Sequence, residues 1–270
     1  MPELPEVETT CLGLRPRLLD RRLQKLTVRN SRLRWPVPED LAGRLEGKTL
    51  AGLSRRGKYL LFDFGGVTQI AHLGMSGSLR FAETGEPAGI HDHIDWIFEG
   101  GVILRLRDPR RFGAVLWSAN PMHHPLLARL GPEPLTDAFD ANYLYAQCRT
   151  RSAAIKQVIM DGHVVVGVGN IYASESLFHA GIRPGTSARR LTRPACARLA
   201  AAIKRVLAAA IAAGGSSLRD YVQTSGELGY FQLHTQVYDR AGLACKRCNT
   251  PIRRIIQGQR ASFYCPQCQR

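Results

Sequence analysis

The 270-residue sequence lacks several features, and each absence narrows the class of protein. No uncharged apolar run reaches the roughly 18 residues of a membrane-spanning helix, so no membrane span is expected. The first ten residues contain three glutamates and no basic residue, which is the reverse of a secretory signal. The 44 % of hydrophobic residues nevertheless suffices for buried cores. We therefore expect a cytoplasmic globular protein with room for roughly two ordinary domains.

Acidic residues are scarce relative to basic ones. The chain has 37 Lys and Arg against 22 Asp and Glu, a net charge of +15. Only six of the basic residues are lysines, so each lysine is informative. An excess of this size favours a polyanionic partner, nucleic acid first and an anionic membrane surface second. Residues 240–270 hold seven basic residues and no acid, which predicts a phosphate-binding surface near the C-terminus.

Cysteine is used in two ways. Three scattered cysteines are predicted to be small core residues, namely Cys11, Cys148 and Cys196. The other four form C-x2-C-x16-C-x2-C and are Cys245, Cys248, Cys265 and Cys268. Two close pairs of thiolates suit one tetrahedral structural zinc ion. The alternative is two disulfides in a secreted protein, but the sequence shows no secretion signal and leaves three cysteines over. The zinc should supply much of the folding free energy of this short hairpin.

Apolar spacing predicts a helix followed by strands in the N-terminal half. Residues 3–19 place five apolar side chains at steps of three and four, and these are Leu4, Val7, Cys11, Leu14 and Leu18. Between residues 20 and 117 the pattern changes to strands, including 59–64 and a hairpin of 93–98 and 102–107. Alternation in the second arm predicts a basic face that carries Arg105 and Arg107. Several strands without intervening helices favour a sandwich.

The C-terminal half is predicted to be helical. Segments 141–160, 170–181 and 191–213 have helical spacing, and glycines indicate a loop over 216–234. The zinc hairpin follows. The predicted fold class is α+β, with an N-terminal β-sandwich domain over 1–130, a helical domain over 131–234 and a zinc-finger hairpin over 235–270.

The N-terminal sequence Met1-Pro2-Glu3 is a candidate reactive site. Methionine is commonly removed before a small second residue, which would leave Pro2 as a secondary amine beside Glu3. An α-amino group has a pKa of about 8, so part of it is unprotonated at neutral pH. Such an amine can attack a sugar aldehyde carbon and form an iminium ion. The alternative is structural, since proline is well tolerated at the start of a helix.

Several ordered blocks resemble the formamidopyrimidine-DNA glycosylases, a family of bacterial base-excision repair enzymes related to endonuclease VIII. The blocks span most of the chain and lie at residues 2–10, 56–60, 72–77, 91–93, 108–113 and 166–175, followed by the hairpin around Gln259-Arg260. The continuation of the N-terminal block, together with Met75, Arg110 and Phe112, favours the formamidopyrimidine type. The resemblance implies a monomeric enzyme that acts on damaged double-stranded DNA, with one structural zinc ion, no nucleotide cofactor and no membrane partner.

The resemblance also implies catalytic roles in the β-sandwich domain. Pro2 would attack C1′ of the damaged nucleoside, and Glu3 would protonate the deoxyribose ring oxygen. Lys58 would act as a general acid–base group during β-elimination, a role that lysine can perform and its arginine neighbours cannot. Arg260 matches an arginine assigned to phosphate binding and δ-elimination. Its high pKa favours phosphate binding over proton donation.

Further positions match DNA contacts in the same family. A flipped nucleotide leaves a hole in the duplex. Met75 and Phe112 would fill it, and Arg110 would bind the orphaned base. The remaining DNA-binding positions that the resemblance implies are His91, Arg151, Lys156 and Asn170. The loop at 216–230 would cover the lesion, and residues around Asn170 would form a helix-two-turn-helix.

The segment 164–173 admits a second interpretation. It has the order strand, G-x-G-x-x-A and helix, which is similar to a dinucleotide-binding fingerprint. That fingerprint requires an acidic residue about 20 positions later, at the end of a second strand. Residues 186–190 offer none. Amides at the helix N-terminus, with Asn170, therefore suit a DNA phosphate better.

The prediction for function is a bifunctional DNA glycosylase and abasic-site lyase. It would excise oxidised purines such as 8-oxoguanine and formamidopyrimidines through a Schiff base on Pro2, and cleave the strand by β,δ-elimination. The alternative is a noncatalytic zinc-ribbon protein that binds nucleic acid, because the charge and the cysteines fit both. Only the enzyme needs a free amine at Pro2 and a lysine at position 58.

Overall fold

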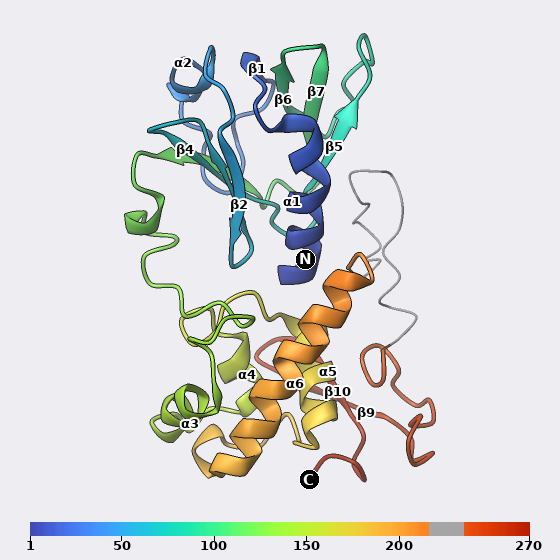
Figure 1. The fold of residues 1–270 in the computed structure, drawn as a ribbon. Coiled ribbons are helices and arrows are strands. Elements are labelled where there is room, and N and C mark those ends of the chain that lie inside the picture. Colours follow the sequence, from blue (N-terminus) through green and yellow to red (C-terminus); the bar gives the residue numbers. More distant parts are fainter. Residues whose placement is uncertain (216–234) are drawn as a thin grey trace. The chain divides into compact units, whose positions relative to one another are not determined.

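The structure is a computed structural model that describes residues 1–215 and 235–270 (Figure 1). These residues form two compact units, one of residues 1–128 and 213–215 and the other of residues 129–212 and 235–270. The mixed helix and strand content confirms the predicted α+β class. Within the described ranges, no helix is long and apolar enough to cross a membrane. The predicted lesion-covering loop at 216–230 lies outside the described residues, and the three-domain division stays a prediction.

The first unit begins with helix α1 (Leu4–Leu18), where the apolar stripe predicted it. The five stripe residues are almost fully buried, at 0–1 % exposure. Glu3 is the N-cap, and its backbone N–H donates to Glu6 Oε2 at 2.7 Å. This capping box satisfies amide groups that have no partner within the helix. The start of α1 is therefore fixed at Glu3.

Two antiparallel four-stranded sheets complete this unit. One has the order β1 (Leu23–Val28), β6 (Asp92–Phe98), β7 (Val102–Arg107), β5 (Ser78–Ala82). The other has the order β2 (Gly52–Arg56), β3 (Tyr59–Asp63), β4 (Thr68–His72), β8 (Ala114–Ser118). A short helix α2 (Leu41–Leu45) and a 3-10 turn η1 (Pro121–His123) lie in the connections. Side chains from both sheets and α1 join one buried cluster, as the sandwich prediction required.

The predicted basic face of β7 is wrong at Arg105, which is only 3 % exposed. Its guanidinium group forms two hydrogen bonds with Asp95, both at 2.8 Å. Arg29 also pairs with Asp95, at 2.7 Å. Arg80 pairs with Glu86 and Asp92, and Arg105 reaches the same two carboxylates. We call these six residues the ion cluster. Alternation alone predicted a solvated arginine because it does not show which carboxylates lie on neighbouring strands.

Helices dominate the second unit. They are α3 (Ala141–Arg149), α4 (Ile155–Met160), α5 (Asn170–Ala180), the 3-10 turn η2 (Ala188–Arg190) and α6 (Arg193–Ala212). The predicted helix 141–160 is thus two helices. It breaks before α4 because Ala154 pairs with Ser187 as an isolated bridge, and the backbone N–H of Ile155 donates to Thr186 O at 2.7 Å.

The predicted strand at 164–166 is also absent. The N–H groups of Val164 and Val165 both donate to Asp161 O, which makes this segment a turn. Three consecutive valines suggested a strand, but all three are buried and serve as core residues of the turn. The strand–glycine–helix order of a dinucleotide fingerprint therefore does not exist here.

The C-terminal hairpin joins the second unit. It consists of β9 (Arg253–Gln257) and β10 (Arg260–Tyr264), which pack with α5 through a small core around Phe178 and Phe263. Buried Glu175 of α5 accepts hydrogen bonds from the backbone N–H groups of three successive residues, which are Gln236, Val237 and Tyr238. Burial raises the pKa of Glu175, and these amide donors act against that rise. The entry to the zinc module is thereby fixed to α5.

Candidate functional site

The N-terminal residues lie inside the first unit rather than on its surface. Pro2 is buried and Glu3 is 3 % exposed. Lys58 occupies the two-residue turn between β2 and β3, and its neighbour Gly57 has a φ of +58°. Glycine suits this position because the first central residue of such a hairpin turn needs a positive φ.

Contacts along α1 place the Lys58 turn near the start of the helix. Arg15 Nε donates to Leu53 O at 2.8 Å, and Arg55 Nε bonds Glu8 Oε2 at 2.6 Å. Strand β2 therefore runs beside α1 toward the helix N-terminus (Figure 1). From the Arg55–Glu8 pair, three strand residues up to Lys58 cover about 10 Å, and five helix residues back to Glu3 cover about 8 Å. The turn thus reaches the level of Pro2 and Glu3.

His72 lies next to this turn, opposite Tyr59 across strands β3 and β4. Their ring centroids are 4.8 Å apart. Burial, together with the positive charges of Lys58 and Arg34, lowers the pKa of His72 to about 4. The imidazole is therefore neutral at pH 7. Its Nδ1 accepts the backbone N–H of Gly74 at 3.0 Å, which leaves the other ring nitrogen as the donor.

Met75 and Phe112 are exposed, at 39 % and 42 %, so neither is an ordinary core residue. They lie on two loops that touch at Gly74. A Cβ at Gly74 would come within 2.4 Å of the backbone carbon of Phe112, and the φ of Gly74 is +63°. Only glycine fits this close approach. The two apolar side chains are thus held on one surface, and we call their loops the wedge loops, residues 72–77 and 108–113.

One buried carboxylate ties the wedge loops together. Asp108, at 0 % exposure, accepts the hydroxyl of Ser76 at 2.9 Å and the backbone N–H of Gly113 at 2.8 Å. Ser76 Oγ in turn accepts the backbone N–H of Arg110 at 3.2 Å. The Asp108 N–H donates to His91 O at 3.0 Å, which brings His91 beside the same loops. The sequence predicted His91 and Arg110 here, but assigned no role to Asp108 or Ser76.

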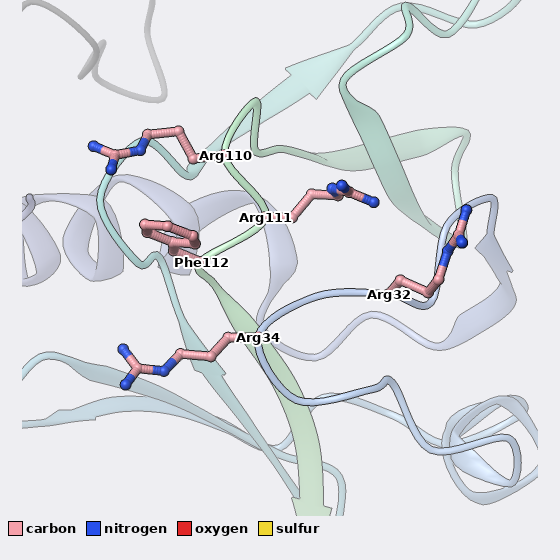
Figure 2. A pocket seen from close by; sticks show the side chains of 5 residues that line it. All are labelled: Arg32, Arg34, Arg110, Arg111 and Phe112. Carbon is pink, nitrogen blue, oxygen red and sulfur yellow. The ribbon is translucent and has the colours of Figure 1, made fainter.

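A basic pocket opens beside Phe112. It has a volume of about 670 Å³ and is lined by Arg32, Arg34, Arg110, Arg111 and Phe112 (Figure 2). The guanidinium carbon of Arg110 lies 4.7 Å from the centroid of the Phe112 ring. Arg111 has a φ of +56°, and its side chain points away from Arg110 (Figure 2). Arg32 and Arg34 come from a loop some 75 positions earlier, so sequence spacing gave no signal for them.

In the second unit, Lys156 is buried instead of exposed, at 2 %. Its Nζ donates to Asn170 Oδ1 at 2.6 Å, Ala261 O at 3.0 Å and Ser262 Oγ at 2.7 Å. This fixes the orientation of the Asn170 amide, because Oδ1 accepts from Lys156 and the NH₂ group faces the other way. Asn170 is the first residue of α5, at the positive end of the helix dipole, which favours an anion.

Arg260 begins β10, directly after the hairpin turn. It is exposed and lines a cavity of about 200 Å³ with five other residues, which are Lys156, Gln157, Met160, Gln257 and Gly258. Arg151 follows α3 and donates to Gln147 O at 2.7 Å. The second unit therefore brings Lys156, Asn170 and Arg260 together and holds Arg151 against α3.

The four hairpin cysteines form one cluster, with all sulfur atoms within 4.8 Å of one another. The Sγ atoms of Cys248 and Cys265 are 3.4 Å apart, and those of Cys245 and Cys268 are 3.9 Å apart. Tetrahedral zinc with bonds of about 2.3 Å requires sulfur atoms about 3.8 Å apart, whereas a disulfide needs about 2.05 Å. The cluster fits a single structural zinc ion and excludes the two-disulfide alternative. Cys11, Cys148 and Cys196 are fully buried, as predicted.

Family comparisons cover most of the chain. The model described as "Formamidopyrimidine-DNA glycosylase N-terminal domain" matches residues 1–115, and the one described as "Formamidopyrimidine-DNA glycosylase H2TH domain" matches residues 130–222. The model described as "Zinc finger found in FPG and IleRS" matches residues 242–270. The zinc module is therefore one part of a larger enzyme family, and the alternative of a noncatalytic zinc-ribbon binder is wrong.

Curated relatives and solved structures point to the same family as the family models. The chain is 73 % identical to a formamidopyrimidine-DNA glycosylase of Thiobacillus denitrificans and 59 % identical to one of Thioalkalivibrio sulfidiphilus, each over the full length of both chains. It is similar to the crystal structure of MutM (FPG) from Thermus thermophilus, with a TM-score of 0.90, 39 % identity and coverage of 99 % and 98 %. A Lactococcus lactis FPG mutant bound to Fapy-dG containing DNA matches with a TM-score of 0.93, 34 % identity and full coverage of both chains. The chain belongs to the formamidopyrimidine-DNA glycosylase family.

Proposed function

We propose that this protein excises oxidised purines and then cleaves the resulting abasic site, as a monomer acting on damaged double-stranded DNA. The glycosylase part follows from membership in a family of base-excision repair enzymes. The observation that supports the chemistry is the buried Pro2-Glu3 start of α1 at the level of the Lys58 turn. Relatives from Lactococcus lactis form complexes with DNA that contains Fapy-dG or an abasic site.

The reaction requires a free secondary amine. After removal of Met1, the Pro2 nitrogen attacks C1′ of the damaged nucleotide, and the bond between C1′ and the nucleobase breaks. The nucleobase leaves with the electron pair of that bond and takes up the proton that the attacking amine loses. Glu3 supplies a proton to the ring oxygen when the sugar opens, which leaves an iminium ion on Pro2. Glu3 is well placed for this, since its backbone is fixed by the capping box with Glu6.

Strand cleavage needs a side chain near the sugar that can accept a proton. The iminium ion draws electrons from C2′, so loss of a C2′ proton expels the 3′ phosphate by β-elimination. Lys58 is the side chain that we assign to this proton transfer. Its turn is held by the Arg55–Glu8 ion pair, and Arg55 Nη1 also donates to Gly57 O at 2.9 Å.

DNA contacts support base extrusion. Met75 and Phe112 would enter the stack where the nucleotide has left, and Arg110 would bond the orphaned base. His91, adjacent to the wedge loops, would contact the backbone. The link through Asp108 keeps both wedge loops in one geometry before DNA arrives.

The second unit would contribute phosphate contacts. Asn170 presents its NH₂ group because Lys156 occupies its carbonyl oxygen. Lys156 lines the cavity beside Arg260, so both cations would attract a phosphate there. Arg260 would bind phosphate as δ-elimination proceeds, and Arg151 would add a further backbone contact.

A trapping experiment tests the proposal. Purified protein is incubated with a duplex that carries 8-oxoguanine opposite cytosine, in the presence of borohydride. Reduction of the iminium ion should give a covalent adduct that peptide mass analysis places on Pro2, with Met1 absent from the intact mass. A variant with Met1 retained, made by Pro2→Leu, should bind the duplex without an adduct. Intact lesion DNA as the sole product with wild-type protein would refute the enzyme assignment.

A further inference from the structure

We propose that Arg32 and Arg34 complete a phosphate-binding pocket for the DNA strand opposite the lesion. The inference rests on the proposed function, because it uses the position of the wedge loops in the duplex. The two arginines join Arg110, Arg111 and Phe112 around the cavity of about 670 Å³ (Figure 2). No role was predicted for Arg32 or Arg34 from the sequence.

The loop that carries the two arginines is built to present them. Leu33 and Val37 are buried, at 7 % and 4 %, and their N–H groups both donate to Ser31 O at 2.9 Å. Arg32 and Arg34, on either side of Leu33, are therefore directed outward and exposed. The N–H of Arg34 donates to Gly113 O at 3.1 Å, which fixes this loop to the wedge loop.

The charges in this pocket are unbalanced. In the described part of the chain, none of the four guanidinium groups pairs with a carboxylate, whereas Arg55 and Arg105 of the same unit each do. The guanidinium carbons of Arg34 and Arg110 lie 5.1 and 4.7 Å from the ring centroids of Trp35 and Phe112, so their contacts are with aromatic rings and not with an anion. Four like charges around one cavity repel one another, so an anion bound among them relieves that repulsion.

The occupant that fits is a DNA phosphodiester. Planar guanidinium groups bind phosphate oxygens through paired hydrogen bonds. The pocket also shares Arg110 and Phe112 with the wedge loops. A duplex bound to the wedge loops therefore brings its backbone to the pocket. Each strand carries one phosphate about every 3.4 Å along the helix axis.

The strand follows from the direction of the side chains. Arg110 is assigned to the orphaned base, which belongs to the strand opposite the lesion. The left-handed backbone of Arg111 turns its side chain away from Arg110, toward the side where Arg32 lies (Figure 2). The guanidinium groups of Arg111 and Arg32 thus lie on the side of the pocket away from Arg110, and we assign to them the phosphates of the strand that carries the orphaned base.

Binding measurements with strand-specific neutral linkages test the inference. The probe is a duplex with a tetrahydrofuran abasic analogue opposite cytosine, which is bound without being cleaved. R32Q/R34Q should bind it roughly tenfold more weakly at about 0.2 M salt, with the slope of log K against log salt reduced by about 2. Methylphosphonates flanking the orphaned cytosine should weaken wild-type binding but have little further effect on R32Q/R34Q.

Control variants separate pocket charge from net charge and from folding. R22Q/K25Q removes the same charge from exposed positions before and on β1, and should change the salt slope much less. R32K/R34K keeps the charge and should retain most of the slope. The pocket assignment would be overturned if R32Q/R34Q lost no more binding affinity and no more salt slope than R22Q/K25Q. The strand assignment would be overturned if methylphosphonates in the lesion strand weakened wild-type binding by the same factor and had little further effect on R32Q/R34Q.

Borohydride trapping with wild-type protein keeps the two proposals distinguishable. If wild type forms no adduct but R32Q/R34Q still shows the coupled binding loss, the chemistry fails and the pocket stands. If wild type forms the adduct and R32Q/R34Q binds like R22Q/K25Q, the chemistry stands and the pocket is refuted.

Discussion

Asp108 offers the sharpest test of how the wedge loops are held. Its two carboxylate oxygens accept from Ser76 Oγ at 2.9 Å and from the Gly113 N–H at 2.8 Å, at a site with 0 % exposure. Asp108→Ala removes both acceptors and leaves two buried donors unsatisfied. Asp108→Asn keeps the shape, since its carbonyl accepts from Gly113 and its NH₂ group donates to Ser76 Oγ.

Hydrogen bonds to a charged group contribute about 1.5–3 kcal/mol each. Asp108→Ala should therefore destabilise the native conformation of the wedge loops by about 3–6 kcal/mol, and Asp108→Asn should destabilise it by about 1–2 kcal/mol. Ser76→Ala removes one of the two bonds and should fall between them. Since about 1.4 kcal/mol corresponds to a factor of ten, kcat/KM for Asp108→Ala should fall at least about a hundredfold.

The assay follows wedge insertion directly. A duplex with 2-aminopurine beside 8-oxoguanine reports loss of stacking in stopped-flow fluorescence, and thermal melting verifies that each variant is folded. Asp137→Ala, which removes an exposed carboxylate, is the matched control and should behave as wild type. A folded Asp108→Ala protein with the wild-type insertion rate and kcat/KM would refute the role of Asp108.

Three further predictions follow from individual groups. The pKa of His72 is about 4 in the folded protein against an ordinary 6.5, so the unfolded chain takes up its proton first. Stability from this group is complete above pH 6.5 and should fall by up to about 3 kcal/mol between pH 6.5 and 4, a slope that His72→Asn lacks in urea unfolding. Lys156→Met should lower the free energy of unfolding by about 3 kcal/mol, because one buried and two half-buried acceptors lose their donor. Lys204→Met should lower it by less than about 1 kcal/mol. Zinc removal by a chelator should abolish hydrogen-exchange protection in 245–268 but not in β6 and β7, and should weaken DNA binding until zinc is restored. Unchanged protection after verified loss of the metal would contradict the zinc assignment.

The sequence predicted those elements whose pattern is local. The apolar stripe of α1, the β6–β7 hairpin and the cysteine spacing each depend on residues close together in the chain, so periodicity and spacing suffice. The exposure of Met75 and Phe112 was implied only through the resemblance, because an apolar residue in a strand-rich region is by default a core residue.

What the sequence could not predict depends on contacts between distant segments. Asp108 matters because Ser76, 32 positions earlier, turns its hydroxyl toward it. Arg105 is buried because Asp95 lies opposite on the neighbouring strand, and Lys156 is buried because β10 returns to it 105 positions later. Such polar partners leave no periodic signal in the sequence, since the identity of a single charged residue does not show whether its side chain is solvated or paired.

The ion cluster has a consequence for the behaviour of the sandwich on heating. Its six residues come from or beside all four strands of one sheet, with Arg29 following β1, Arg80 on β5, Glu86 after β5, Asp92 and Asp95 on β6 and Arg105 on β7. The cost of dehydrating buried charges falls as temperature rises, because ion hydration carries a strongly negative entropy. Ion pairs therefore link all four strands of this sheet, and their net contribution to the free energy of unfolding increases as the temperature rises.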